Sequence, residues 1–130
     1  MKKFIPILLS VLMFTGCAAV SNNPANTYRQ ITMDEAVAMM EQESDYIILD
    51  VRRPDEFAAG HIPGAINVPN ETIGTVEISE LPDKNQLIMV YCRSGRRSKE
   101  AAGKLVKLGY TNIVEFGGIL DWKGETVTGK

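Results

Sequence analysis

The chain has 130 residues, 45% of them hydrophobic and 23% charged, and its 14 lysines and arginines against 16 aspartates and glutamates give a formal net charge of −2. This slightly acidic balance excludes the strongly basic surface typical of nucleic-acid-binding proteins, so we expect no nucleic-acid partner. About a hundred residues remain once an N-terminal leader is set aside, enough for one small domain with a single core.

The first residues have the pattern of an export signal. Lys2 and Lys3 give a positive start, and the following run, residues 4–14, is apolar apart from Ser10. Such a run is too short to cross a membrane as a helix and is typical of a signal-peptide core. We therefore predict a signal peptide over residues 1–16, whose removal would leave 12 basic and 16 acidic residues and a net charge of −4.

The segment Phe14-Thr15-Gly16-Cys17 resembles the lipobox of bacterial lipoproteins. That resemblance implies cleavage before Cys17, lipidation of its thiol, and anchoring through more than one acyl chain, which holds a protein stably on a membrane. We expect an exported protein, lipid-anchored on the periplasmic or outer cell-surface side, with the choice between inner and outer membrane left open. The alternative is simple secretion after cleavage behind Ala19.

Residues 17–30 are predicted to be the lipidated cysteine and a flexible tether. The stretch Ser21–Thr27 is polar, contains a proline and has no apolar periodicity, which is typical of a linker. The folded domain follows over residues 31–130.

Hydrophobic patterns within the domain predict alternating helices and strands. In chain order they are a helix over residues 33–42, a strand over 46–49, a short helix over 54–59, a strand over 65–68, a strand over 87–91, a helix through 101–108 and a strand over 112–116. A capping box of Thr32 and Glu35 supports the first helix, and Gly109 ends the last. The segment 70–81 is ambiguous, and Gly117-Gly118 is expected to turn the chain into a short final element.

This alternation predicts an α/β domain with a mostly parallel sheet, helices on both faces and right-handed crossovers. In such sheets ligands bind beyond the carboxyl ends of the strands. Asp50 and Cys92 directly follow two of the predicted strands. We therefore expect the functional site at that edge.

The loop Cys92-Arg93-Ser94-Gly95-Arg96-Arg97-Ser98 lies between a predicted strand and a predicted helix. If it curls around the cysteine, as Gly95 permits, its backbone N–H groups form an anion-binding nest beside the helix N-terminus. This nest and the neighbouring cations favour the thiolate, which makes Cys92 a candidate nucleophile that needs no histidine base. The same groups could bind an oxyanion such as the sulfonate end of thiosulfate.

Other polar residues near the strand ends are assigned supporting roles. Asp50 could accept hydrogen bonds from the loop amides or offset an arginine, and Arg52 and Glu56 are spaced to pair with each other. His61 lies in a tight Gly-His-Ile-Pro-Gly turn. We interpret it as a hydrogen-bonded turn residue.

Several separated motifs together resemble those of a single-domain rhodanese. They are Leu49-Asp50-Val51-Arg52, Glu56-Phe57, Gly60-His61-Ile62-Pro63-Gly64-Ala65, Asn67, Pro69, the Tyr91–Ser98 loop, Ala101-Ala102, Leu105, Gly109-Tyr110 and Gly117-Gly118 through Trp122.

The resemblance implies a rhodanese-like fold with a small five-stranded sheet. It implies a sulfurtransferase in which Cys92 takes a sulfane sulfur from a small donor such as thiosulfate, as a persulfide, and passes it to a thiol or cyanide. The substrate would lie against Arg93, Ser94, Gly95, Arg96, Arg97 and Ser98, with Arg97 closing the loop and Asp50 and Arg52 bracing it.

Two alternatives remain open. A phosphatase or arsenate reductase would place the arginine six residues after the cysteine, where this chain has Ser98. A non-catalytic or relay module would present Cys92 to a protein partner at the membrane for thiol or persulfide exchange. No metal-ligand cluster or dinucleotide glycine motif is present in the sequence, so we expect no metal and no cofactor.

Overall fold

The computed structural model describes residues 27–74 and 76–130. The predicted signal peptide, Cys17 and most of the predicted tether lie outside this range. The elements are β1 (Arg29–Gln30), α1 (Met33–Gln42), β2 (Tyr46–Asp50), α2 (Pro54–Ala59), β3 (Ile66–Asn67), the 3-10 helix η1 (Asn70–Thr72), β4 (Leu87–Cys92), α3 (Arg96–Lys107), β5 (Ile113–Gly118) and the 3-10 helix η2 (Ile119–Asp121). Within the described residues, no helix has both the length and the apolar character needed to span a bilayer.

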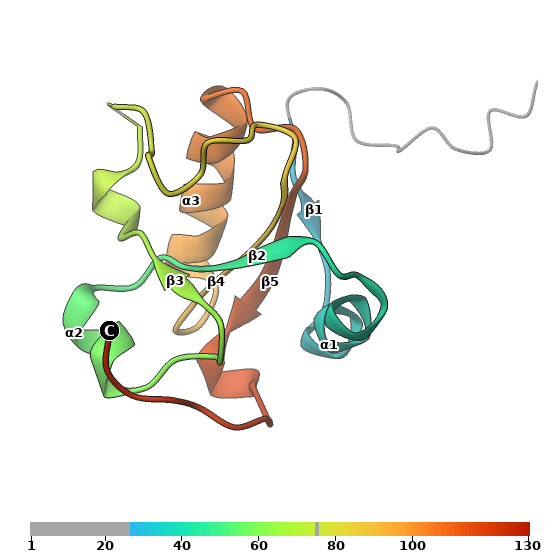
Figure 1. The fold of residues 1–130 in the computed structure, drawn as a ribbon, viewed down its shortest axis with the longest axis vertical. Helices are drawn as coiled ribbons and strands as arrows, with labels where there is room; N and C mark the ends of the chain where they lie inside the picture. The colour runs from blue at the N-terminus through green and yellow to red at the C-terminus, as the bar shows by residue number, and fades with distance from the viewer. Residues whose placement is uncertain (1–26, 75) are drawn as a thin grey trace, which may run out of the picture.

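The five strands form one sheet in the order β1-β5-β4-β2-β3, and every neighbouring pair is parallel. The predicted α/β fold with a parallel five-stranded sheet is confirmed. β4 lies between β2 and β5 (Figure 1), and all six of its residues are buried. Central parallel strands are covered on both faces, which explains the uninterrupted apolar sequence of β4.

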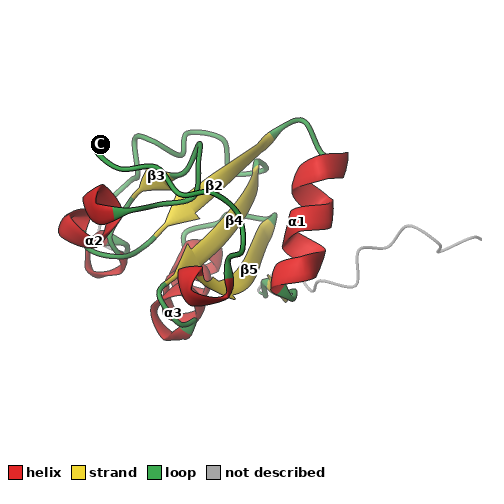
Figure 2. Ribbon diagram, turned by 90° about the horizontal axis from the view of Figure 1, so that it is seen from below, coloured by secondary structure: helices red, strands yellow, loops and turns green. Residues whose placement is uncertain are grey.

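Helices cover both faces of the sheet, with α1 and α3 on opposite sides (Figure 2). Because side chains alternate along a strand, Ile88, Val90 and Cys92 face α3, whereas Met89 and Tyr91 face α1. Each face has its own hydrophobic core. Cys92 therefore belongs to the α3 face.

Local signals explain the helix ends. The Thr32 Oγ1 accepts a hydrogen bond from the Glu35 amide at 3.1 Å, and Glu35 Oε1 accepts one from the Thr32 amide at 3.1 Å, which completes the predicted capping box. α3 ends at Lys107, and Gly109 follows two residues later with a φ of +98°. A glycine adopts that left-handed conformation without strain.

Some element boundaries differ from the sequence predictions. Arg29 and Gln30 pair with Val114 and Glu115, so the sheet begins two residues before the predicted domain boundary at residue 31. β5 continues through Gly118 instead of turning at Gly117. In the ambiguous segment 70–81, the described residues include one short helix, η1, over Asn70–Thr72.

The sheet topology brings the ends of β2 and β4 together. Asp50 is in register with Tyr91, the residue before Cys92, and Cys92 is in register with Gly118 of β5. The loop after β4 therefore starts at the carboxyl edge of the sheet, with β2 and β5 on either side, as expected for a ligand site in this class of fold.

Candidate active site

Cys92 is the last residue of β4 and lies beneath the loop that follows it. Its side chain is buried, with 1% of the residue exposed, and it is a free cysteine. The backbone N–H of Gly95 donates to the sulfur at 3.0 Å. The loop therefore does curl around the cysteine and points an amide dipole at Sγ, an arrangement that favours negative charge on the sulfur.

Glycines at two positions allow the loop to take this shape. Gly95 has a φ of +115°, in the left-handed region, and α3 begins immediately after it. Gly118 lies directly beneath the loop, since a Cβ there would overlap the carbonyl of Arg93 and the amide of Ser94. The Arg93 carbonyl also accepts from the Leu120 amide at 3.2 Å. Gly118 thus seats the loop against β5.

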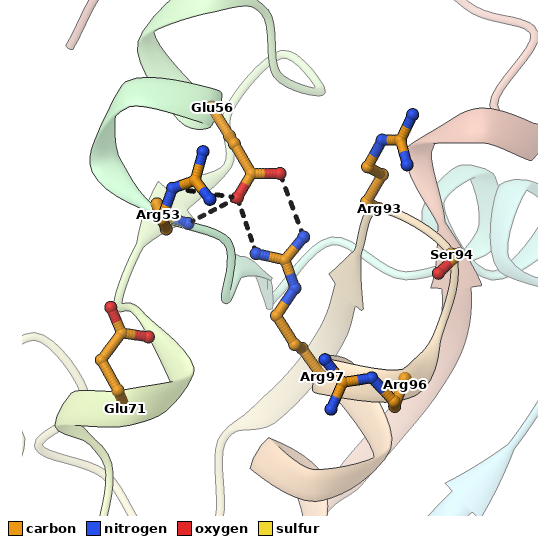
Figure 3. Close-up of a pocket in the computed structure, with 7 residues that line it drawn as sticks. All are labelled: Arg53, Glu56, Glu71, Arg93, Ser94, Arg96 and Arg97. Carbon is orange, nitrogen blue, oxygen red and sulfur yellow. Dashed lines mark hydrogen bonds and ion pairs between the residues drawn. The ribbon is translucent and has the colours of Figure 1, made fainter.

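An open cavity of about 670 Å³ lies over the outer side of the loop. Its walls combine the loop with two segments that are distant in sequence (Figure 3). The lining residues are Arg93, Ser94, Arg96 and Arg97 from the loop and α3, Arg53 and Glu56 from the start of α2, and Glu71 from η1. Four of these seven side chains are arginines, so the cavity is suited to anions.

Arg97 extends across the cavity to Glu56 (Figure 3). Its two terminal nitrogens donate to the two carboxylate oxygens at 2.6 and 3.0 Å, a bidentate pair. These hydrogen bonds lower the pKa of Glu56 from 4.5 to about 2 and raise the pKa of Arg97. The ion pair ties α3 to α2 at the mouth of the site.

The sequence prediction for Glu56 was wrong, because it was expected to pair with Arg52. Arg52 instead forms a bidentate pair with Asp50, whose Oδ2 lies 2.7 Å from Arg52 Nη2. The side chains of both are almost fully buried, and Arg52 also donates to the Gly60 carbonyl at 2.7 Å. Helical spacing suggested a pairing between residues 52 and 56, but Arg52 precedes α2 and points toward the sheet.

Asp50 therefore offsets an arginine, one of the two roles predicted for it, and the bracing of the Cys92 loop by this pair stays a prediction. Asp50 is in register with Tyr91, whose side chain is on the sheet face opposite Cys92. The Arg52 guanidinium lies 5.8 Å from the centre of the Tyr91 ring, and burial together with hydrogen bonding to Asp50 raises the pKa of Tyr91 above its usual value. The pair therefore contacts Tyr91, the residue before Cys92.

The predicted substrate-binding residues fall into two groups. Arg93, Ser94 and Arg96 are exposed, and Arg97 is half-buried, so these four face the cavity. Gly95 and Ser98 are buried beneath it, beside the sulfur. Arg96 also forms an exposed ion pair with Glu100 at 3.1 Å.

A buried glutamate of the site was not found from the sequence. Glu115 of β5 is 2% exposed, and its Oε2 accepts from the Ser98 hydroxyl at 2.6 Å. The sequence did contain a signal for it, because Glu115 is the charged residue within the otherwise apolar run 113–116 of a predicted strand. A carboxylate that is buried in a strand requires specific hydrogen-bond partners.

His61 is a structural residue, as predicted. Its ring stacks on Phe57 with centroids 3.7 Å apart, and Nδ1 lies 2.8 Å from the Phe57 carbonyl. Its backbone pairs with Val127 near the C-terminus.

Across residues 27–74 and 76–130, no group of three histidine, cysteine, aspartate or glutamate side chains is arranged to hold a metal ion.

Comparisons with known proteins agree with this geometry. The chain matches the family model of the rhodanese-like domain over residues 32–125. Thiosulfate sulfurtransferase PspE of Escherichia coli strain K12 is 38% identical over 73 residues, which cover 56% of this chain and 70% of PspE. A sulfurtransferase of Allochromatium vinosum is 39% identical over 79 residues, which cover 60% of this chain and 72% of the relative.

A solved structure described as a rhodanese with anions from E. coli superimposes with a TM-score of 0.59 and 36% sequence identity. The superposition covers 65% of this chain and 99% of that one. The shared fold therefore includes nearly the whole of the smaller protein.

Proposed function

Because this chain belongs to the rhodanese-like domain family, we propose that it is a sulfurtransferase that carries a sulfane sulfur as a persulfide on Cys92. The observation that carries the proposal is the position of Cys92 under a curled loop, with an amide N–H on its sulfur and arginines on the outer side. Relatives named as sulfurtransferases support the same class of reaction.

The proposed reaction has two displacements at sulfur. In the first, Sγ of Cys92 attacks the outer sulfur of thiosulfate, the S–S bond of the donor breaks, and sulfite leaves with the electron pair. In the second, a thiol or cyanide attacks the outer sulfur of the persulfide, and Sγ leaves with the electron pair. Both the donor and the persulfide are anions, and the N–H of Gly95 with the guanidinium groups around the cavity supports negative charge in both steps.

Phosphoryl transfer is disfavoured by the residue in the sixth position of the loop. A phosphatase would have an arginine there, whose guanidinium binds the tetrahedral phosphate. This chain has Ser98, which is fully buried and hydrogen-bonded to Glu115. An assay with an aryl phosphate tests this alternative and is expected to show no hydrolysis.

We also propose that the mature protein is anchored to a membrane through lipid on Cys17, as the lipobox-like segment suggests. Export would place the sulfur-transfer reaction outside the cytoplasm. Intact mass measurement of the protein purified from membranes tests this: acyl chains on an N-terminal Cys17 support the proposal, and an N-terminus at residue 20 without lipid contradicts it.

The test of the main proposal is intact mass spectrometry of the full chain after incubation with thiosulfate. We expect a gain of one sulfur atom, mapped to the Cys92 peptide and removed by cyanide, and no gain in Cys92→Ser. A persulfide that transfers only to a protein thiol and not to small acceptors would support the relay module. An unchanged mass, with Cys92 still open to alkylation, would refute the persulfide mechanism.

A further inference from the structure

Two buried side chains beside Cys92 have no part in the mechanism above. Glu115 of β5 is 2% exposed and Ser98 of α3 is fully buried. The Oε2 of Glu115 accepts two hydrogen bonds, from the Ser98 hydroxyl at 2.6 Å and from the Gly117 amide at 2.7 Å. Ser98 Oγ in turn lies 3.4 Å from Sγ of Cys92. The three residues form a continuous chain from the sulfur to a carboxylate.

The direction of the hydrogen bonds along this chain follows from the single proton of the serine hydroxyl. Ser98 Oγ lies close to Glu115 Oε2, to the Gly95 carbonyl at 2.9 Å and to the Gly117 carbonyl at 3.3 Å. The Glu115 oxygen is the nearest of these acceptors, so the hydroxyl donates to Glu115. Ser98 is then left with a lone pair toward Cys92, and the thiol donates to it.

The surroundings of Cys92 make an internal proton acceptor useful. The residue is 1% exposed, so bulk water has little access to the thiol proton. Among the described residues, one backbone amide, that of Gly95, donates to the sulfur. The guanidinium of Arg97 is held by Glu56 at the mouth of the cavity. Neither group can take up a proton.

No other charged group competes for Glu115 in the described part of the chain. The charged side chains of the adjoining elements are engaged elsewhere or exposed. Arg29 of β1 contacts Asn112, Arg96 and Arg97 of α3 pair with Glu100 and Glu56, and Lys104 of α3 donates to Asn70. Arg93 of the loop and Lys99 and Lys107 of α3 are exposed. α1 packs on the opposite face of the sheet. Cys92 of β4 is therefore the titratable group linked to Glu115.

We propose that Glu115, acting through Ser98, receives the proton of the Cys92 thiol when the sulfur attacks its donor. The S–H bond breaks, its proton passes to Ser98 Oγ, the proton of Ser98 passes to Glu115 Oε2, and the electron pair left on Sγ forms the bond to the donor sulfur. When an acceptor later removes the outer sulfur, Sγ leaves with its electron pair and takes a proton back from Ser98, which Glu115 resupplies. Glu115 is a positioning residue, because it touches the reacting sulfur only through Ser98.

This inference uses the sulfur donor of the proposed function, but the ionisation of Cys92 can be measured without one. We would measure, from about pH 5.5 to pH 9, both the rate of sulfur gain from thiosulfate and the rate of Cys92 alkylation by iodoacetamide, resolved from Cys17 by peptide mapping. The variants are Glu115→Gln, which is isosteric and can still accept from Gly117, and Ser98→Ala. Glu41→Gln, an exposed position on α1, is the control.

We expect Glu115→Gln and Ser98→Ala to slow both reactions by about a hundredfold near pH 6, the lower end of the range of general base effects. The deficit should shrink toward pH 9, because hydroxide then removes the proton, and the double variant should be no slower than either single variant. Glu41→Gln should match the wild type throughout.

The relay is refuted if the deficit is the same at every pH, which indicates a structural role, or if Glu115→Gln reacts faster at low pH, which indicates simple charge repulsion. If the wild type is alkylated but gains no sulfur, the proposed function is wrong. The relay is then tested by comparing the pH dependence of alkylation between the wild type and the variants. If neither reaction occurs in the wild type, the thiol is sealed and both proposals are wrong.

Discussion

The ion pair between Glu56 and Arg97 should contribute stability that disappears in acid. The pKa of Glu56 falls from 4.5 to about 2 in the folded protein, mainly through its hydrogen bonds to Arg97. At about 1.4 kcal/mol for each pH unit, this corresponds to about 3 kcal/mol of folding free energy at pH 7. Both side chains are largely buried, at 15% and 23% exposed, so solvent screens the pair only in part.

The sign of the pH dependence follows from the lowered pKa. Above about pH 5 the carboxylate is ionised in both the folded and the unfolded chain, and the full stabilisation is present. As the pH falls toward 2, the unfolded chain binds a proton more readily than the folded one, and the stabilisation is lost. Glu56→Gln lacks this contribution at every pH, so the variant and the wild type should converge in acid.

Urea unfolding of both proteins at pH 7, 5, 4 and 3 provides the measurement. We expect Glu56→Gln to be less stable by about 2–3 kcal/mol at pH 7, with the difference shrinking below pH 5. Asp55→Asn is the matched control on the same helix, because its ion pair with Arg53 is exposed and screened by solvent, so its loss should leave the free energy of unfolding nearly unchanged. A difference for Glu56→Gln that does not change with pH, or is below about 0.5 kcal/mol at pH 7, contradicts the reasoning.

Four further substitutions test other parts of the structure. Gly118→Ala places a methyl group against the loop backbone and should reduce sulfur gain from thiosulfate at least about tenfold. Gly103→Ala is its control, because a Cβ there meets open space, and it should stabilise the protein by up to about 1 kcal/mol in urea unfolding. Asp50→Asn leaves the buried charge of Arg52 without its partner and should cost about 3–5 kcal/mol in the same assay; a loss below about 1 kcal/mol would contradict the burial of that charge. Tyr91→Phe removes the acceptor of a buried backbone amide and should cost about 1–3 kcal/mol without moving the pH profile of Cys92 alkylation.

Much of the fold could be predicted because local and tertiary signals agree. The bounds of α1 match the prediction because the Thr32 capping box fixes its start independently of packing. β4 was recognised because a strand covered on both faces must be apolar throughout. β1 was missed, since its two exposed residues carry no pattern and become a strand only because β5 offers them a free edge.

The candidate site was predicted in part for a similar reason. The loop from Cys92 to Ser98 is one continuous segment, so its composition alone predicted that it curls around the cysteine. The partners of Arg97 and Ser98 are Glu56 and Glu115, 41 and 17 positions away, and only the fold brings them together. Spacing along a helix is no guide to contacts between separate elements.

The depth of the Cys92 sulfur also limits the size of its reaction partners. Because 1% of the residue is exposed beneath a loop seated on Gly118, we expect the thiol to react with a narrow molecule that carries a terminal sulfur more readily than with the cysteine of a folded protein. Bulky disulfides should therefore exchange with it slowly. In an oxidising compartment this steric selection would preserve a lone thiol from mispairing while leaving it open to small sulfur compounds.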